Sequence, residues 1–269
     1  MEAKIYAPVG KCIYCGSLEW SPDKARKLGN EHIIPEGLGG RLVLPESSCK
    51  RCETETSRME LEWLRSSFYA ARVQKGLGKK KKRTPQHLLL KVQTKRESFL
   101  KRILVEQYPA IIVTLVFDQP EILLDAKPIT KELSGGVAIG TLPTFGQHLK
   151  PHLDQGSVTF SPPRSSATSR SLGRMLAKIA HSYAIAELGP EGFQSFLTPI
   201  ILGTDTRHLP YHIGGNRKIP QATKDVCQIE LKSVQSDAGR QYFMVIVRLL
   251  SDVQGMPEYR VVVGQPQGR

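Results

Sequence analysis

Apolar residues along this sequence recur at helical spacing in two well-separated stretches. After Cys52 they return mainly every three or four positions, at Met59, Leu61, Trp63, Leu64, Phe68, Ala71 and Val73. This spacing, with no proline between residues 46 and 84, predicts a helix from about 53 to about 75. Ser169–Leu188 shows the same periodicity, and Gly189 with Pro190 marks its end. Pro151 lies between His148 and His152, so no regular helix is expected there.

Strand-like patterns dominate the second half of the chain. Ala110–Phe117 is a continuous apolar, β-branched run, which predicts a buried strand. Val226–Val234 and Tyr242–Leu250 flank the turn sequence Asp237-Ala238-Gly239, which predicts a hairpin, and Tyr259–Val263 would add a third antiparallel strand. The expected fold class is therefore α+β, with an antiparallel sheet in the larger, C-terminal part.

A polar stretch rich in helix breakers, residues 76–86, is the clearest boundary in the chain. It predicts a first domain over residues 1–75, a basic linker over 76–86, and a C-terminal α+β domain over 87–269. The role expected for the C-terminal domain is substrate selection, partner binding or dimerisation. The sequence has no apolar run long enough for a membrane helix and no secretory signal, so we expect a cytoplasmic protein without a membrane partner.

Positive charge is concentrated in one segment. The formal net charge is +13, and residues 72–102 hold twelve basic residues against one acid, Glu97, which accounts for +11 of it. This concentration indicates a polyanionic partner, and the densest part predicts phosphate contacts by Lys79, Lys80, Lys81, Lys82 and Arg83. A solvated linker and a localisation signal remain alternatives for such a run.

Four of the five cysteines form two C-x-x-C pairs, Cys12 with Cys15 and Cys49 with Cys52. Four thiolates are the ligand set of a tetrahedral structural zinc ion, and they leave no open coordination position. We therefore expect structural Zn²⁺ that stabilises a short segment with a small core. The fifth, Cys227, is expected to be a buried apolar residue.

Between the cysteine pairs lies Glu31-His32, within a stretch (28–45) whose glycines suit a β-hairpin. A carboxylate is a hard ligand for Mg²⁺ or Mn²⁺, and an imidazole titrates near neutrality and can accept a proton from water. An ordinary exposed pair is the alternative interpretation of these two residues.

The order C-I-Y-C-G, E-H-I-I-P-E-G-L-G-G, L-V-L-P and C-K-R-C-E resembles the zinc-bearing HNH nuclease family over residues 11–62. The resemblance implies a ββα-metal fold that cleaves phosphodiesters with one catalytic divalent ion, Mg²⁺ or Mn²⁺. By position, His32 would be the general base, Glu31 and Glu53 would hold the catalytic ion, and the four cysteines would bind zinc. Two departures stand out: residues 33–48 contain no asparagine, and Glu53 replaces the usual histidine or asparagine.

The function that follows from this resemblance is that of a metal-dependent DNA endonuclease, in restriction or antiviral defence, with RNA left open as a substrate. A single site cuts one strand, so a double-strand break would need a homodimer or two encounters. The alternative is a non-catalytic, zinc-dependent nucleic-acid-binding protein. In a third interpretation the C-terminal domain senses a ligand and the nuclease is its effector.

Overall fold

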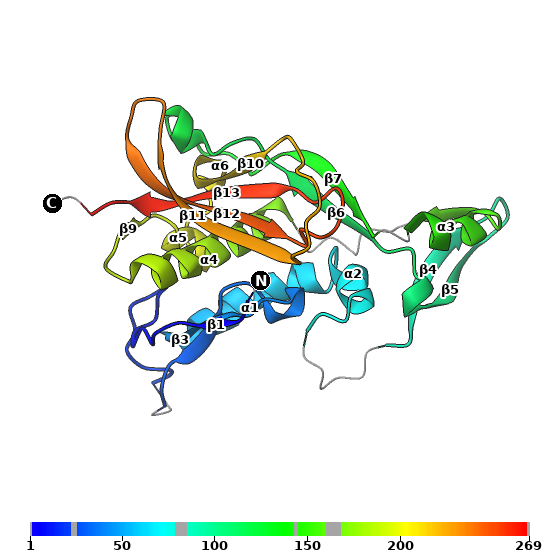
Figure 1. The fold of residues 1–269 in the computed structure, drawn as a ribbon, viewed down its shortest axis with the longest axis horizontal. Coiled ribbons are helices and arrows are strands. Elements are labelled where there is room, and N and C mark those ends of the chain that lie inside the picture. The colour runs from blue at the N-terminus through cyan, green and yellow to red at the C-terminus, as the bar shows by residue number, and fades with distance from the viewer. Residues whose placement is uncertain (1, 23–25, 79–84, 143–144, 160–167, 268–269) are drawn as a thin grey trace.

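The computed structural model describes residues 2–22, 26–78, 85–142, 145–159 and 168–267. The protein is a mixed α+β fold and contains a cluster of four cysteines. Within these ranges its strands pair antiparallel, except for one short parallel pair between Lys4–Ile5 and Leu42–Val43. In Figure 1, a C-terminal sheet lies over helix α4 (Ser169–Leu188), and the N-terminal segment lies on the other side of that helix. Helix α4 therefore forms the middle layer of the body.

The N-terminal segment is a small sheet followed by two helices. Its strands, in the order β1-β3-β2, are β1 (Lys4–Ile5), β3 (Leu42–Ser48) and β2 (Gly29–His32). Strands β2 and β3 pair antiparallel, as the hairpin prediction expects, and the 3-10 turn η1 (Glu36–Leu38) lies in their connection. Strand β3 leads directly into α1 (Lys50–Leu64), which is followed by α2 (Tyr69–Gln74).

The prediction of one helix from about 53 to 75 is wrong in two respects. Helix α1 begins earlier, at Lys50, because Cys49 already acts as its extended N-cap. It also ends at Leu64, where the chain turns and the Phe68 amide donates to the Trp63 carbonyl at 3.1 Å. The turn lets both aromatic rings enter the core, with their centroids 5.5 Å apart.

The C-terminal sheet has the order β10-β13-β12-β11, and the short strand β9 (Gln194–Ser195) pairs with β13. Its main strands are β10 (Ile213–Asn216), β11 (Cys227–Gln235), β12 (Gln241–Leu249) and β13 (Glu258–Gln265). The predicted hairpin and its third antiparallel strand are thus confirmed, as is the helix over 169–188. Short helices α5 (Thr198–Leu202) and α6 (Leu209–His212) lie between β9 and β10 in the sequence, and α6 contacts the turn η3 (Glu121–Leu124).

Two further sheets lie between the N-terminal segment and α4 in the sequence. Strand β6 (Ile111–Val116) confirms the strand predicted over 110–117 and pairs with β7 (Gly136–Thr141). The other sheet, of order β5-β4-β8, consists of β4 (His87–Gln93), β5 (Ser98–Leu104) and β8 (Ser157–Thr159), and the turn η2 (Val105–Gln107) follows β5. With α3 (Phe145–Leu153) it forms a unit that projects from the body in Figure 1.

Helix α3 contradicts the expectation of no regular helix around His148 and His152. Pro151 lies inside it, only two residues before its end. The proline removes one hydrogen bond, the one to the carbonyl of Gln147 four residues earlier, and the helix forms despite this loss.

The main core crosses the boundary predicted from the sequence. One cluster of buried apolar residues runs from Cys12 to Val263 and includes Met59, Trp63, Leu172 and Leu176. Helix α4 contacts α1 on one side and strands β12 and β13 on the other. The N-terminal segment thus shares its buried surface with the C-terminal part. No helix in the described ranges combines the length and apolar character needed to cross a membrane.

Candidate functional site

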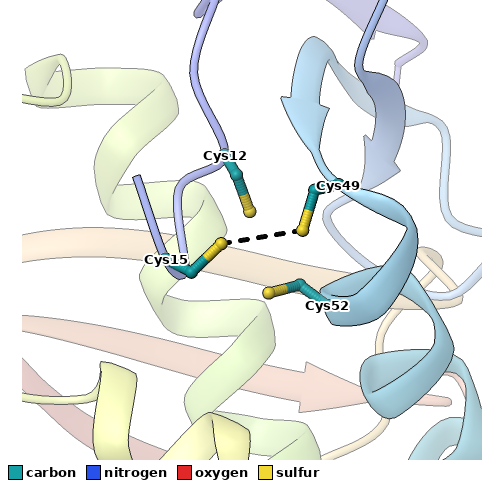
Figure 2. A group of neighbouring side chains, drawn as sticks. All are labelled: Cys12, Cys15, Cys49 and Cys52. Atoms are coloured by element: carbon teal, nitrogen blue, oxygen red, sulfur yellow. Dashed lines mark hydrogen bonds between the residues drawn. The ribbon is translucent and has the colours of Figure 1, made fainter. Parts of the chain in front are cut away.

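The four cysteines of the two C-x-x-C pairs converge at one point. Cys12 and Cys15 lie in the loop after β1, Cys49 caps α1, and Cys52 lies in its first turn. Their sulfur atoms all lie within 4.8 Å of one another, and Cys15 Sγ is 3.6 Å from Cys49 Sγ (Figure 2). A tetrahedral zinc ion with Zn–S bonds of about 2.3 Å places its sulfurs about 3.8 Å apart. The cluster therefore has the donors and the spacing to hold zinc.

The electrostatics of the cysteine cluster also favour a bound cation. A hydrogen bond from Cys52 lowers the pKa of the Cys12 thiol to about 4, although its burial opposes this. The same contact and burial raise the pKa of Cys52, and burial raises that of Cys49. Four thiolates this close repel one another, so they can ionise together only around a cation.

Helix α4 supports the first cysteine pair, Cys12 and Cys15, from behind. His181 is buried, and its Nε2 lies 2.9 Å from the carbonyl oxygen of Ile13, between Cys12 and Cys15. Because a carbonyl only accepts, Nε2 carries the proton and Nδ1 accepts from the Ser195 hydroxyl at 3.0 Å. Burial lowers the pKa of His181, which keeps the ring neutral. The loop that carries Cys12 and Cys15 is thus fixed to the C-terminal part of the chain.

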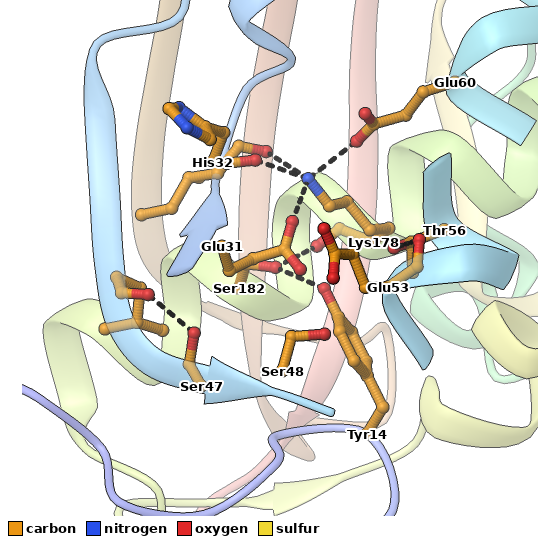
Figure 3. Close-up of polar contacts among 12 residues, drawn as sticks. Tyr14, Glu31, His32, Ser47, Ser48, Glu53, Thr56, Glu60, Lys178 and Ser182 are labelled. Carbon is orange, nitrogen blue, oxygen red and sulfur yellow. Dashed lines mark hydrogen bonds and ion pairs between the residues drawn. The ribbon is translucent and has the colours of Figure 1, made fainter. Parts of the chain in front are cut away.

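Glu31, a predicted metal ligand, is buried and forms an ion pair with a residue that the sequence analysis did not single out. Its Oε1 lies 2.5 Å from Nζ of Lys178 on α4, a side chain only 1% exposed. The same ammonium group lies 2.7 Å from Oε1 of Glu60 on α1. It also donates to the main-chain carbonyls of His32 and Ile33 (Figure 3). Lys178 therefore joins strand β2, helix α1 and helix α4 at one point.

The charges in this buried cluster depend on one another. Burial opposes the positive charge of Lys178, but the carboxylates of Glu31 and Glu60 outweigh it and raise the pKa of the ammonium group. Burial raises the pKa of Glu60, and the charge of Lys178 opposes that rise. Burial and the charge of Glu31 raise the pKa of Tyr14, whose hydroxyl lies 3.1 Å from Ser182 Oγ. One ammonium group therefore stabilises two buried acids, and the remaining imbalance of charge agrees with the raised pKa of Glu60.

His32, the predicted general base, lines an open pocket of about 570 Å³. Its Nδ1 is buried and has no hydrogen-bond partner among the described residues. Glu60 and Arg72 line the same pocket, and Arg72 Nε donates to the Gly37 carbonyl at 3.1 Å. The pocket thus presents an imidazole, able to accept a proton, beside a guanidinium, able to contact an anion.

Glu53, the third predicted catalytic residue, lies in the first turn of α1, next to Cys52. Its Oε2 is buried and has no hydrogen-bond partner in the part of the chain that the structure describes. Across those residues, only the four cysteines form a group of three or more metal-binding side chains this close together. Glu31, His32 and Glu53 are not assembled into a second such group.

The predicted phosphate contacts Lys79, Lys80, Lys81, Lys82 and Arg83 lie outside the described residues. The basic segment that follows them forms β4 and β5. In their antiparallel register Leu89 pairs with Arg102 and Lys91 with Leu100, and all four side chains are exposed on one face. This open face therefore carries two cations among apolar side chains, and no acid lies within either strand.

Three side chains of the site, Lys178, Glu60 and Arg72, were missed as functional candidates. Arg72 was counted only as part of the basic run. Lys178 stands among apolar residues in Leu176–Ala180, and a charge inside an apolar helical stretch was the one available signal. Its partners could not be read from the sequence because they lie far away, such as the His32 carbonyl 146 positions earlier.

The loop of Cys12 and Cys15 and the Lys178 cluster both lie where the N-terminal segment packs on α4. Glu60 belongs to that cluster and also lines the His32 pocket. No protein-family model matches this sequence, and no curated protein or solved structure is significantly similar to it. The functional assignment therefore rests on the residues of the site itself.

Proposed function

We propose that this chain hydrolyses phosphodiester bonds in nucleic acid, with His32 as the general base. The observation that carries the proposal is the place of His32: its side chain lines an open pocket together with the guanidinium group of Arg72. Its main chain is also held in place, because its carbonyl accepts from the buried Lys178. An imidazole that lines an open pocket, on a main chain that is held in place, suits proton abstraction from water.

In this mechanism His32 takes a proton from a water molecule that attacks phosphorus. Arg72, in the same pocket, contacts the phosphoryl oxygens as negative charge develops on them. General-base catalysis contributes about 10²–10⁴-fold, so stabilisation of that charge must supply much of the remaining rate.

The divalent ion implied by the HNH resemblance stays a prediction. Of its two proposed ligands, Glu53 has a carboxylate oxygen without a partner in the described ranges, whereas Glu31 is paired with Lys178. When bound, Mg²⁺ or Mn²⁺ would neutralise charge on the phosphoryl group and on the leaving oxygen. Glu53 is therefore the better candidate of the two.

A nucleic-acid substrate is supported by the charge of the chain and its placement. The net charge is +13, and the basic segment continues into the open face of β4 and β5, with Lys91 and Arg102. Phosphate backbones bind such surfaces through release of counterions. DNA is the substrate we propose first, and an RNA arm belongs in the same assay.

Cleavage of supercoiled plasmid tests the proposal. Wild type, His32→Ala and a matched control, His208→Ala, should be compared with Mg²⁺, with Mn²⁺ and in buffer freed of both. A strong chelator should be avoided, because it would also remove the structural zinc. We expect nicking by wild type and the control, and a loss of about 100-fold or more in His32→Ala. Equal cleavage by all three would refute the role of His32.

A non-catalytic, zinc-dependent nucleic-acid-binding protein is the second candidate. One observation favours it: the carboxylate of Glu31 is in an ion pair with Lys178, rather than free to bind a metal ion. This candidate predicts that wild type shifts DNA in a gel but leaves supercoiled plasmid intact with every divalent ion tested.

A further inference from the structure

The surroundings of the Lys178 ammonium group resemble those of a metal ion. Two carboxylate oxygens, from Glu31 and Glu60, lie 2.5 and 2.7 Å from Nζ. Two main-chain carbonyl oxygens, of His32 and Ile33, accept from the same nitrogen. Carboxylates and backbone carbonyls are the oxygen ligands that hard divalent cations take up in proteins.

We propose that Lys178 is an internal cation occupying a divalent-cation site, and that removing its ammonium group opens a Mg²⁺ or Mn²⁺ site formed by Glu31, Glu60 and the carbonyls of His32 and Ile33. The inference goes beyond the proposed function, because it concerns ion binding and needs no reaction. It assigns Glu60 a place that the HNH resemblance does not give it.

The arrangement of the chain favours a cation here. The acids come from two elements, Glu31 from β2 and Glu60 from α1, and both carboxylates turn toward one point (Figure 3). Two buried carboxylates repel each other and lose their hydration, so a cation between them stabilises the state in which both are ionised. Because Lys178 is part of the chain, its positive charge is present in every molecule, whatever the concentration of ions in solution.

Lys178 and a divalent ion exclude each other from this position. The ammonium group fills the space between the oxygens, and an added ion within a few ångströms of it would meet like charge in a buried environment. In the wild-type chain, Glu31 therefore neutralises Lys178 instead of holding a catalytic metal. Lys178 is a positioning residue for His32, through the carbonyl of that residue.

Binding of Mn²⁺ to the zinc-loaded full chain tests this inference by electron paramagnetic resonance and by calorimetry. Lys178→Ala removes the ammonium group and leaves space, so we expect Mn²⁺ to bind at least about tenfold more tightly than to wild type. Lys178→Met removes the charge but keeps the volume, so it should gain much less. The double variant Lys178→Ala with Glu60→Gln should lose the gain.

Two results would overturn the inference. One is a Mn²⁺ site in wild type that Glu31→Gln weakens about tenfold or more, because an ion would then occupy Glu31 alongside Lys178. The other is a folded Lys178→Ala chain that gains no Mn²⁺ affinity. If that variant does not fold, Lys178→Ser takes its place, because a small hydroxyl also leaves space between the oxygens and can still donate to one carboxylate, and an absent gain there counts equally against the inference.

Plasmid cleavage separates this inference from the proposed function. Wild type that nicks DNA while Lys178→Ala gains no Mn²⁺ would leave the nuclease proposal standing and remove the internal cation. If wild type does not nick DNA but Lys178→Ala gains a Mn²⁺ site, the internal cation stands and the nuclease proposal falls.

Discussion

His181 on α4 hydrogen-bonds the carbonyl oxygen of Ile13, which lies between Cys12 and Cys15, the first C-x-x-C pair. Since α4 also packs on the C-terminal sheet, the loop of this pair is in direct contact with the main core. We therefore expect that loss of zinc from the cysteine cluster would lower the stability of the C-terminal part as well as that of the first 75 residues.

Removal of zinc should lower the melting temperature of the whole chain in one transition. Both a chelator and the substitution Cys49→Ser should lower the melting temperature. Added zinc should restore the melting temperature of the chelated wild type but not that of the variant. The control is Cys227→Ala, which changes a buried cysteine outside the cluster. Circular dichroism and calorimetry would report the transition. A C-terminal part that melts at its normal temperature without zinc would contradict the shared core.

Lys178→Met should destabilise the protein by about 3–5 kcal/mol, because breaking a buried ion pair leaves an uncompensated charge. Adding Glu60→Gln to the same chain should recover part of this loss, since one of the two buried acids is then neutral. Urea unfolding of wild type, single and double variants forms the cycle. Strict additivity of the two changes would show that Lys178 and Glu60 do not interact.

Glu53→Gln should reduce cleavage by about 100-fold or more if Glu53 holds a catalytic ion, while DNA affinity stays unchanged. The matched control is Glu55→Gln, two positions along α1, whose carboxylate lies 4.0 Å from Arg174. Initial rates should be measured over a range of Mg²⁺ concentrations. Equal losses in both variants would point to helix stability and not to metal binding.

Lys91→Gln combined with Arg102→Gln should weaken DNA binding in a salt-dependent way. Removing two phosphate contacts lowers the slope of log affinity against log salt by about 2. The charge-matched control is Lys127→Gln with Lys218→Gln, two exposed cations outside β4 and β5. Fluorescence anisotropy at several salt concentrations gives both slopes. Identical slopes for the two double variants would exclude the open face of β4 and β5 as a DNA contact.

Acid should destabilise the protein partly through His212, which contacts the rings of Phe196 and Tyr211. Burial, followed by the charge of His208, lowers the pKa of His212 to about 4. The unfolded chain binds this proton near pH 6.5, so stability is fully present above about 6.5 and is lost as the pH falls toward 4. In His212→Phe, this part of the loss, about 1–3 kcal/mol, should disappear. Urea unfolding near neutral pH and near pH 5 measures it, and an unchanged pH dependence would refute it.

Local patterns were enough to predict much of this fold. The spacing of the cysteines predicted a cluster that the structure brings together, and the periodicity of 169–188 and of the C-terminal strands predicted α4 and the hairpin. These features depend on residues close in sequence or on a ligand set with a fixed chemistry. The break after Leu64 was missed, because it depends on where Trp63 and Phe68 pack.

The Lys178 cluster could not be predicted from the sequence for a related reason. The local sequence around Glu31 would be the same whether its carboxylate bound a metal ion or an ammonium group. The packing of α4 on β2 and α1 determines which of the two cations it contacts. The motif gave the candidate residues, whereas the electrostatic partner came from a different part of the chain.

The buried contacts of α4 also impose an order on biosynthesis. When the ribosome has released the first 75 residues, the cysteines and Glu31 are present, but His181 and Lys178 have not yet been translated. A nascent or truncated chain that ends before α4 carries two acids without their cation. The centre around His32 is therefore completed late in translation, and prematurely terminated products would lack it.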